Sequence, residues 1–83
     1  MRHIYLLSDA TGETVERVVK AALSQFRNID IKLHRWNRLR TQQDIMRALD
    51  DALTNRGVVI YTLVDTELAR VVRNQAEFYG LET

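Results

Sequence analysis

A nearly unbroken apolar run, VVIYTLV at residues 58–64, constrains the fold of this chain more than any other stretch. A run of this length and composition is typical of a strand covered on both faces, as in a parallel sheet. Residues 3–8, HIYLLS, form a second short run rich in strand formers. Residues 29–36, IDIKLHRW, instead alternate apolar and polar side chains, which indicates a strand with one covered face at a sheet edge. The sequence therefore predicts three strands, of which the first and third are the most buried.

Each predicted strand is followed by a helical pattern, in which apolar side chains recur at spacings of three and four. The first predicted helix covers residues 13–26, the second follows Thr41 and runs to about residue 55, and the third is capped by Asp65 or Thr66. The side chains predicted to form their apolar stripes are Val15, Val18, Val19, Ala22, Leu23 and Phe26, then Ile45, Leu49, Ala52 and Leu53, then Leu68, Val71, Val72 and Tyr79.

Residues that favour helix ends stand at the predicted boundaries. Thr41 and Asp44 have the spacing of a capping box, with Asp in place of the usual Glu. The stretch Asn55-Arg56-Gly57 is typical of a helix end with glycine in the left-handed conformation, and Gly80 is expected to end the third helix.

The resulting order, β-α-β-α-β-α, predicts an α/β fold with a parallel sheet and right-handed crossovers. We expect a three-layer, Rossmann-like arrangement with the strands in the order 2-1-3. Three strands make an incomplete doubly wound sheet. Residues 1–83 are therefore expected to be one domain of a longer protein.

Composition narrows the class of protein. With 83 residues, of which 46% are apolar and 28% charged, the chain is typical of one small soluble domain. Its twelve basic residues are scattered among eleven acidic ones, which argues against a nucleic-acid-binding face. The sequence has no cysteine for a thiolate metal site, no apolar run near the ~18 residues of a membrane span and no recognisable leader. We expect a cytoplasmic protein that binds no nucleic acid, membrane or metal.

A small polar turn, SDATG at residues 8–12, separates the first predicted strand from its helix. In open α/β sheets, ligands bind beyond the carboxyl ends of the strands where the strand order reverses, here between the first and third strands. The turn combines hydroxyl groups with the N–H groups of a helix start, which suits an anion. It matches neither a Walker A sequence nor GxGxxG, and Glu13 would repel a phosphate. Two interpretations stay open, a plain helix cap and a partial phosphate site made of Ser8, Asp9, Thr11, Gly12 and Thr14.

Charged residues near the other predicted strand ends offer further candidates. Arg35, Arg38 and Arg40 form the densest basic group, which could clamp a phosphate or carboxylate or could be a solvated loop. Asp9 and Asp65 end neighbouring strands, where they could approach a metal or a phosphoryl group. Helix capping explains both carboxylates as well.

The ring-bearing residues of the second predicted strand need no functional role. His3 and His34 lie far apart in the sequence, and a single histidine in an alternating strand is interpreted as a surface or packed residue. Trp36 is interpreted as a packing residue because no second aromatic accompanies it.

Several stretches together carry a family resemblance. Residues 4–14, IYLLSDATGET, resemble the opening SD-S/A-TGET of the bacterial regulatory proteins of pyruvate, phosphate dikinase and phosphoenolpyruvate synthase. The resemblance runs from about residue 3 to residue 81. Its other matching stretches are AALSQF at 21–26, His34-Arg35 followed by LRT at 39–41, and VIYTLVD at 59–65 followed by Glu67-Leu68.

The resemblance implies a bifunctional regulator. Such proteins use ADP to phosphorylate a threonine of the target enzyme, and remove that phosphate with inorganic phosphate, releasing pyrophosphate. They are much longer than this chain, and the P-loop that holds their nucleotide lies in a later part that is absent here. Residues 1–83 are therefore expected to be the N-terminal domain, inactive alone, with the ADP site elsewhere and with the dikinase or the synthase as partner.

Two other interpretations remain open. The chain could be a non-catalytic module that docks the target enzyme or forms a homodimer. It could also be a receiver-like phosphoacceptor, because Asp9 and Asp65 end neighbouring strands, although a receiver also needs a lysine on a later strand.

Overall fold

The strands of the computed structural model run parallel in one sheet, in the order β2-β1-β3. The structure describes residues 2–26 and 30–83. Within them the elements are β1 (Arg2–Ser8), α1 (Glu13–Leu23), β2 (Ile31–Trp36), α2 (Gln42–Asn55), β3 (Val58–Thr62) and α3 (Thr66–Tyr79). The predicted α/β class, element order and strand order are confirmed.

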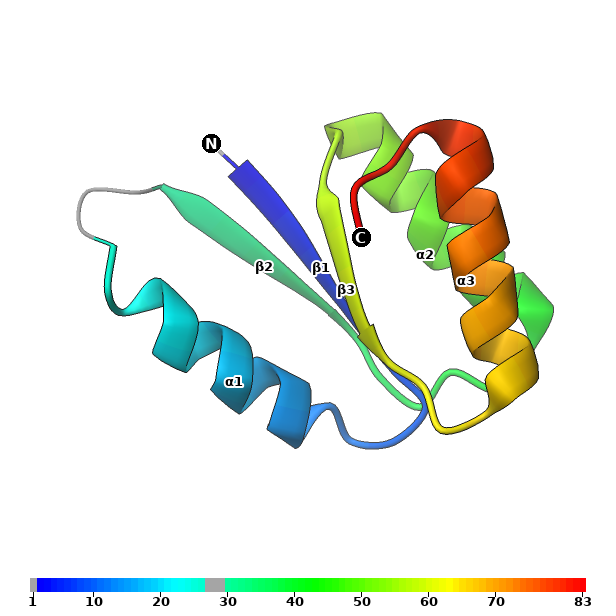
Figure 1. The fold of residues 1–83 in the computed structure, drawn as a ribbon, viewed down its shortest axis with the longest axis horizontal. Helices are drawn as coiled ribbons and strands as arrows, with labels where there is room; N and C mark the ends of the chain where they lie inside the picture. The colour runs from blue at the N-terminus through cyan, green and yellow to red at the C-terminus, as the bar shows by residue number, and fades with distance from the viewer. Residues whose placement is uncertain (1, 27–29) are drawn as a thin grey trace.

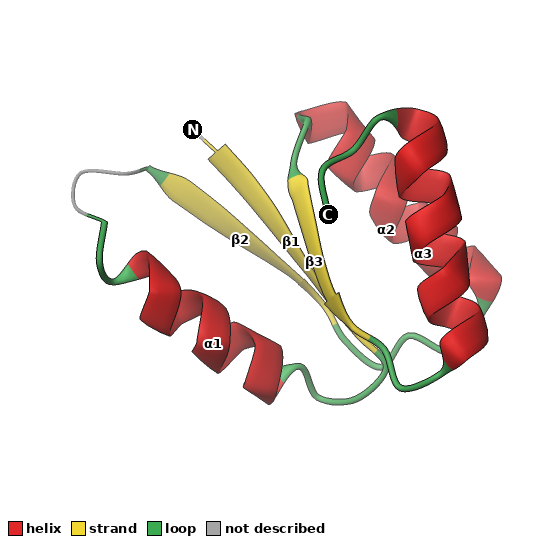
Figure 2. Cartoon of the chain, in the orientation of Figure 1, coloured by secondary structure: helices red, strands yellow, loops and turns green. Residues whose placement is uncertain are grey.

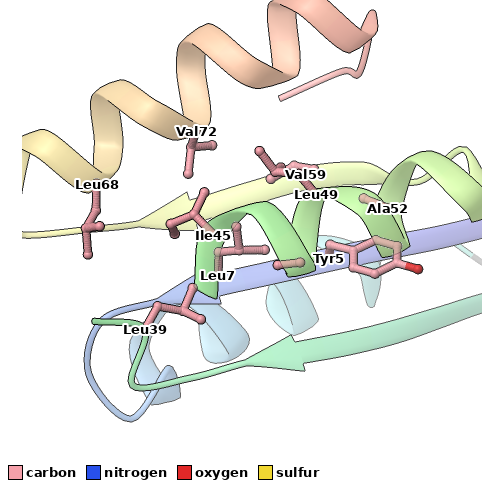
Figure 3. Close-up of a cluster of buried hydrophobic side chains, with 10 residues drawn as sticks. Tyr5, Leu7, Leu39, Ile45, Leu49, Ala52, Val59, Leu68 and Val72 are labelled. Carbon is pink, nitrogen blue, oxygen red and sulfur yellow. The ribbon is translucent and has the colours of Figure 1, made fainter. Parts of the chain in front are cut away.

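Three layers are visible in Figures 1 and 2, with α1 on one face of the sheet and α2 and α3 on the other. The alternation of side chains along β1 explains the division. Leu6 faces α1 and packs with Val15 and Val19. Tyr5 and Leu7 face the helix pair, and Figure 3 shows them in one cluster with side chains of α2 and α3. The central strand β1 is therefore covered on both faces.

The flanking strands are less buried than β1. Residues Tyr5 to Ser8 of β1 are all buried, whereas Val59 is the one fully covered residue of β3 and β2 has none. The predicted edge position of β2 is confirmed, but the expectation of one covered face is wrong. Both faces of β2 are partly covered, because Leu33 packs on the cluster beside α1 and Trp36 on the cluster beside α2 and α3. The predicted strand over 58–64 ends at Thr62, and Val64 is 88% exposed. The predicted strand at 29–36 begins at Ile31, and residue 29 lies outside the described residues.

The first predicted helix is too long and its apolar stripe too wide. α1 ends at Leu23, where the N–H of Ser24 caps it by bonding to Lys20, and Phe26 beyond it is 60% exposed. Val18 and Ala22 are also exposed. Because α1 packs on the sheet alone, the side chains at a spacing of four, Val15, Val19 and Leu23, make all of its contact with the apolar cluster on that face. Leu53 of α2 is likewise 41% exposed, contrary to its predicted place in the stripe.

The predicted role of Gly57 is wrong. Arg56 takes the left-handed conformation after α2, with φ 53°, and Gly57 does not. Glycine is needed at position 57 for space, because a Cβ there would lie 2.6 Å from two ring carbons of Tyr5. The pattern Asn55-Arg56-Gly57 therefore predicted the correct end of α2, although the glycine is needed for space beside Tyr5 and not for a left-handed backbone.

The other predicted helix ends are confirmed. The Thr41 side chain accepts the N–H of Asp44 at 3.1 Å, and the Asp44 carboxylate accepts the N–H groups of Thr41 and Arg40 in return. These backbone bonds, from Arg40 first, lower the pKa of Asp44 to about 2. Gly80 ends α3 in the left-handed conformation, with φ 72°. In the part of the chain that the structure describes, no helix has the length and apolar character needed to cross a membrane.

Candidate functional site

The loops that follow the three strands meet at the carboxyl end of the sheet, where the ribbon of Figure 1 brings them together. The carbonyl of Ser8 accepts the N–H of Leu39 at 3.0 Å, and the carbonyl of Ala10 accepts that of Arg38 at 2.8 Å. The Asp9 carboxylate accepts the N–H groups of Val64 and Asp65, each at 3.0 Å. The turn after β1 is therefore hydrogen-bonded to the loops after both β2 and β3.

The turn enters α1 through Gly12, which is the N-cap residue with φ 79° and ψ 2°. No side chain caps this helix. The hydroxyl of Thr11 lies 3.5 Å from the N–H of Glu13, at the long limit of a hydrogen bond. The hydroxyl of Ser8 accepts the N–H of Ala10 at 3.0 Å and so stabilises the turn. A side-chain cap, one of the two open interpretations of the turn, is therefore absent at Gly12. Within the described residues, the one side-chain acceptor found for the first turn of α1 is the distant Thr11 hydroxyl.

This turn lines a shallow pocket of about 240 Å³. Residues from the end of β3 form its other side. The pocket is lined by Ser8, Asp9, Ala10, Thr11, Gly12, Glu13, Thr14, Thr62 and Val64. All five predicted residues of the turn thus lie around one hollow, together with the N-terminal turn of a helix, whose dipole favours an anion.

The two aspartates at strand ends are both occupied by backbone N–H groups. Asp65 is the N-cap of α3 and accepts the N–H groups of Glu67 at 2.9 Å and Leu68 at 3.2 Å. The bonds from Asp65 and then Val64 hold the pKa of Asp9 below its usual value, so its carboxylate is charged at neutral pH. Within residues 2–26 and 30–83, no group of three or more histidine or carboxylate side chains could hold a metal ion. The capping interpretation of Asp65 is therefore confirmed. The Asp9 carboxylate links the loop after β1 to the loop after β3 by hydrogen bonds.

The three arginines of the predicted clamp point to different partners. Arg35 forms an ion pair with Glu16 of α1, outside the pocket of the turn. Arg40 donates to the carbonyl of Asp9 and so reaches the turn. Arg38 has a left-handed φ of 56°, and it lines a separate hollow of about 310 Å³ with Trp36 and Arg47. The structure brings only Arg40 to the turn by a side-chain contact.

Sequence reasoning missed a histidine pair at the opposite half of the sheet. His3 Nδ1 lies 2.8 Å from His34 Nε2, and the ring of His34 stacks on that of Tyr5 at 4.1 Å between centroids. The hydroxyl of Tyr5 donates to the carbonyl of Asp51, at 3.0 Å. The strand register pairs Tyr5 with His34 and therefore places both histidines on one face. That register was the missing signal.

Fold and loop geometry together define a small parallel α/β domain with a polar, anion-compatible turn where the strand order reverses. The chain belongs to the kinase/pyrophosphorylase family, whose model matches residues 4–83. The resemblance noted from the sequence is thereby confirmed.

Three curated relatives that resemble this chain share one provisional name, pyruvate, phosphate dikinase regulatory protein. The relative from Geobacter metallireducens is 61% identical over 82 residues, which are 99% of this chain and 30% of that protein. The relative from Geotalea uraniireducens is 62% identical over the same length. The relative from Erythrobacter litoralis is 44% identical over 79 residues, 95% of this chain and 28% of that protein. The chain thus spans about 30% of the length of the curated relatives it matches.

Proposed function

We propose that this chain is the N-terminal domain of a cytoplasmic regulator that phosphorylates and dephosphorylates a threonine of pyruvate, phosphate dikinase or phosphoenolpyruvate synthase. The forward reaction uses ADP, and the reverse reaction uses inorganic phosphate and releases pyrophosphate. Membership of the kinase/pyrophosphorylase family and the shared name of the relatives support this proposal. Residues outside this chain bind the ADP, because the turn at residues 8–12 lacks the lysine and the glycine pattern of a nucleotide cradle.

In this proposal the pocket of the turn receives a phosphate group, either that of the target's phosphothreonine or inorganic phosphate. One observation carries this assignment: α1 begins at a left-handed glycine with no side-chain cap, inside a pocket lined by hydroxyl groups. An anion there would accept the N–H groups of the first helical turn. The Asp9 carboxylate repels such an anion less than its position suggests, because hydrogen bonds from two backbone N–H groups partly neutralise its charge. Glu13 limits the affinity of the site.

The pocket also favours a polypeptide ligand over a free ion. Val64, 88% exposed, lines the pocket beside the polar turn. A target loop that carries the phosphothreonine could cover this side chain with an apolar residue, whereas inorganic phosphate could not. The same observation supports the alternative function, a module that only docks the target enzyme.

Two glycine substitutions separate these functions in the longer protein. Gly12→Ala adds a methyl group at a residue that lines the pocket and whose φ is 79°. This methyl group would displace the Asn37 carboxamide from its place beside the turn. Gly80→Ala is the matched control, because its φ is 72° and its methyl group would have nothing within 4 Å. Each substitution should cost about 1–2 kcal/mol of stability through the left-handed backbone alone. We expect only Gly12→Ala to slow phosphate-dependent removal of the target's phosphate, by about 10-fold to 100-fold, for lost contacts to a charged group worth about 1.5–3 kcal/mol.

The measurement is the rate of phosphate-dependent dephosphorylation beside the melting temperature of each variant. Equal melting temperatures with a rate lost only in Gly12→Ala support the phosphate site. Equal rates in the two variants would show that the turn has a purely structural role. Normal chemistry with weakened binding of the target enzyme would favour the docking module.

A further inference from the structure

The outer edge of β3, on the side away from β1, presents backbone groups for another strand. The N–H of Val59 donates to the carbonyl of Glu82 at 2.8 Å, so Val59 directs its backbone groups away from β1. Because successive residues of a strand direct these groups to opposite sides, Ile60 bonds toward β1 and Tyr61 directs its N–H and carbonyl to the outer edge. In the described part of the chain, the Glu82 carbonyl is the single backbone acceptor found along this edge.

The handedness of the crossovers points to the same edge. α2 connects β2 to β3 across β1, and α2 and α3 share one face of the sheet, as Figure 1 shows. A right-handed connection through a helix on that face carries the chain further in the same direction, beyond β3. A strand that follows α3 would therefore lie beside β3, which would give the order β2-β1-β3-β4.

Apolar side chains near the outer edge of β3 are only partly buried, so another strand could cover them further. Tyr61, Leu63 and Leu81 pack against the core cluster while staying partly exposed. A pocket of about 320 Å³ lies beside Leu81, between the ends of α2 and α3 and the start of β3. It is lined by Leu53, Arg56, Gly57, Val58, Tyr79, Gly80, Leu81 and Glu82. One strand along β3 would complete the cover of Tyr61 and Leu63 on this flank.

We propose that the outer edge of β3 is the docking site of a fourth parallel strand, formed by the residues that follow Thr83 in the longer protein. The inference rests on the proposed function, in which this chain is the first domain of such a protein. Two observations select this occupant. The curated relatives are about three times as long as the matched region, and the carbonyl of Glu82 has already reached the edge. The Val59–Glu82 bond is then the first contact of the β3–β4 pair.

Amide hydrogen exchange, followed residue by residue by NMR, tests the proposal in the longer protein and in the 83-residue chain. The amide of Ile60 is the internal control, because it points toward β1 and should be protected in both. The amide of Tyr61 should exchange rapidly in the 83-residue chain and at least about 100-fold more slowly in the longer protein, as expected for a hydrogen bond within a central strand.

Each outcome decides the matter. Slow exchange of Tyr61 that is independent of protein concentration supports the fourth strand. Rapid exchange of Tyr61 in the longer protein, with Ile60 protected, would overturn it. Protection that weakens on dilution would also overturn it, since a second copy would then occupy the edge. The Gly12→Ala variant lies at the turn, away from this edge, and does not alter this readout, so the phosphate site could fail while the fourth strand is upheld, and the reverse.

Discussion

Gly57→Ala should destabilise the fold by crowding one buried ring. The new methyl group would lie 2.6 Å from Cδ1 and Cε1 of Tyr5 and 3.1 Å from the carbonyl oxygen of His3, whereas ordinary contacts begin at about 3.4 Å. Tyr5 has no exposed surface, and its hydroxyl is held by the carbonyl of Asp51 at 3.0 Å and the amide of Asn55 at 2.6 Å. The ring therefore has no free space into which it could turn. Overpacking of this kind costs about 1–3 kcal/mol, and a loss of 2 kcal/mol lowers the melting temperature of a domain this size by about 8–16 °C.

Urea unfolding of the 83-residue chain, followed by circular dichroism, measures the effect. A double-mutant cycle with Tyr5→Leu assigns it, because leucine lacks the two ring carbons that the methyl group would meet. We expect Gly57→Ala to cost at least about 1 kcal/mol less in the Tyr5→Leu background than in the parent chain, because only the 3.1 Å contact with the His3 carbonyl would remain. The reasoning is refuted if Gly57→Ala costs as much there as in the parent chain, or if it costs nothing in either.

Two further predictions concern charged groups. Burial, followed by the charge of His3, lowers the pKa of His34 from 6.5. The unfolded chain therefore binds this proton at higher pH than the folded chain does, and neutral His34 contributes to the free energy of unfolding. That contribution is complete above about pH 6.5 and is lost as the pH falls through the lowered pKa, by at most about 1.4 kcal/mol per pH unit. Urea unfolding at several pH values from 7.5 to 5.0 should show this loss, and His34→Gln should reduce the slope; equal slopes would contradict the assignment. In the longer protein, Arg40→Ala should slow the phosphate-dependent reaction about tenfold, because Arg40 contacts the turn at Asp9, for a lost contact of about 1.4 kcal/mol. Arg35→Ala, which removes an ion pair to Glu16 away from the pocket, should leave that rate within about twofold, and the opposite ranking of the two rates would show that the arginine assignment is wrong.

Most of the fold could be predicted from the sequence because its signals are local or follow from chain handedness. The alternation at residues 31–36, the capping box at Thr41 and the stop at Gly80 depend on neighbours within a few positions. Strand order followed from right-handed crossovers and from the apolar character of the first and third strands. The end of α1 was misjudged because Phe26 continues the helical spacing, although the chain leaves the helix before it. The need for Gly57 could not be predicted, because the ring that requires it belongs to a residue 52 positions earlier.

The residues of the candidate site likewise include some that could be predicted from the sequence and some that could not. The turn at residues 8–12 and the Asp65 cap could be identified because a strand, a turn and a helix start follow one another directly in the sequence. The partners of Arg35 and His34 could not, because each depends on how β2 is aligned with another element. Their closeness in the sequence made Arg35, Arg38 and Arg40 look like one clamp. The strand that carries Arg35 and the loop that carries Arg40 direct these two side chains to different partners.

The placement of the chain ends has a mechanical consequence. β1 starts at the same end of the sheet where Glu82 meets the beginning of β3, and Figure 1 shows both ends of the chain on that side, opposite the polar turn. Sliding β1 along β3 would load all the hydrogen bonds between these two strands at once. A force applied between the two ends of the chain does not act in that way. In the 83-residue chain it would first break the Val59–Glu82 bond and then peel α3 away from its last turn. In a tethered experiment this domain should therefore yield in small successive steps at low force, and the polar turn would be the last part to feel the load.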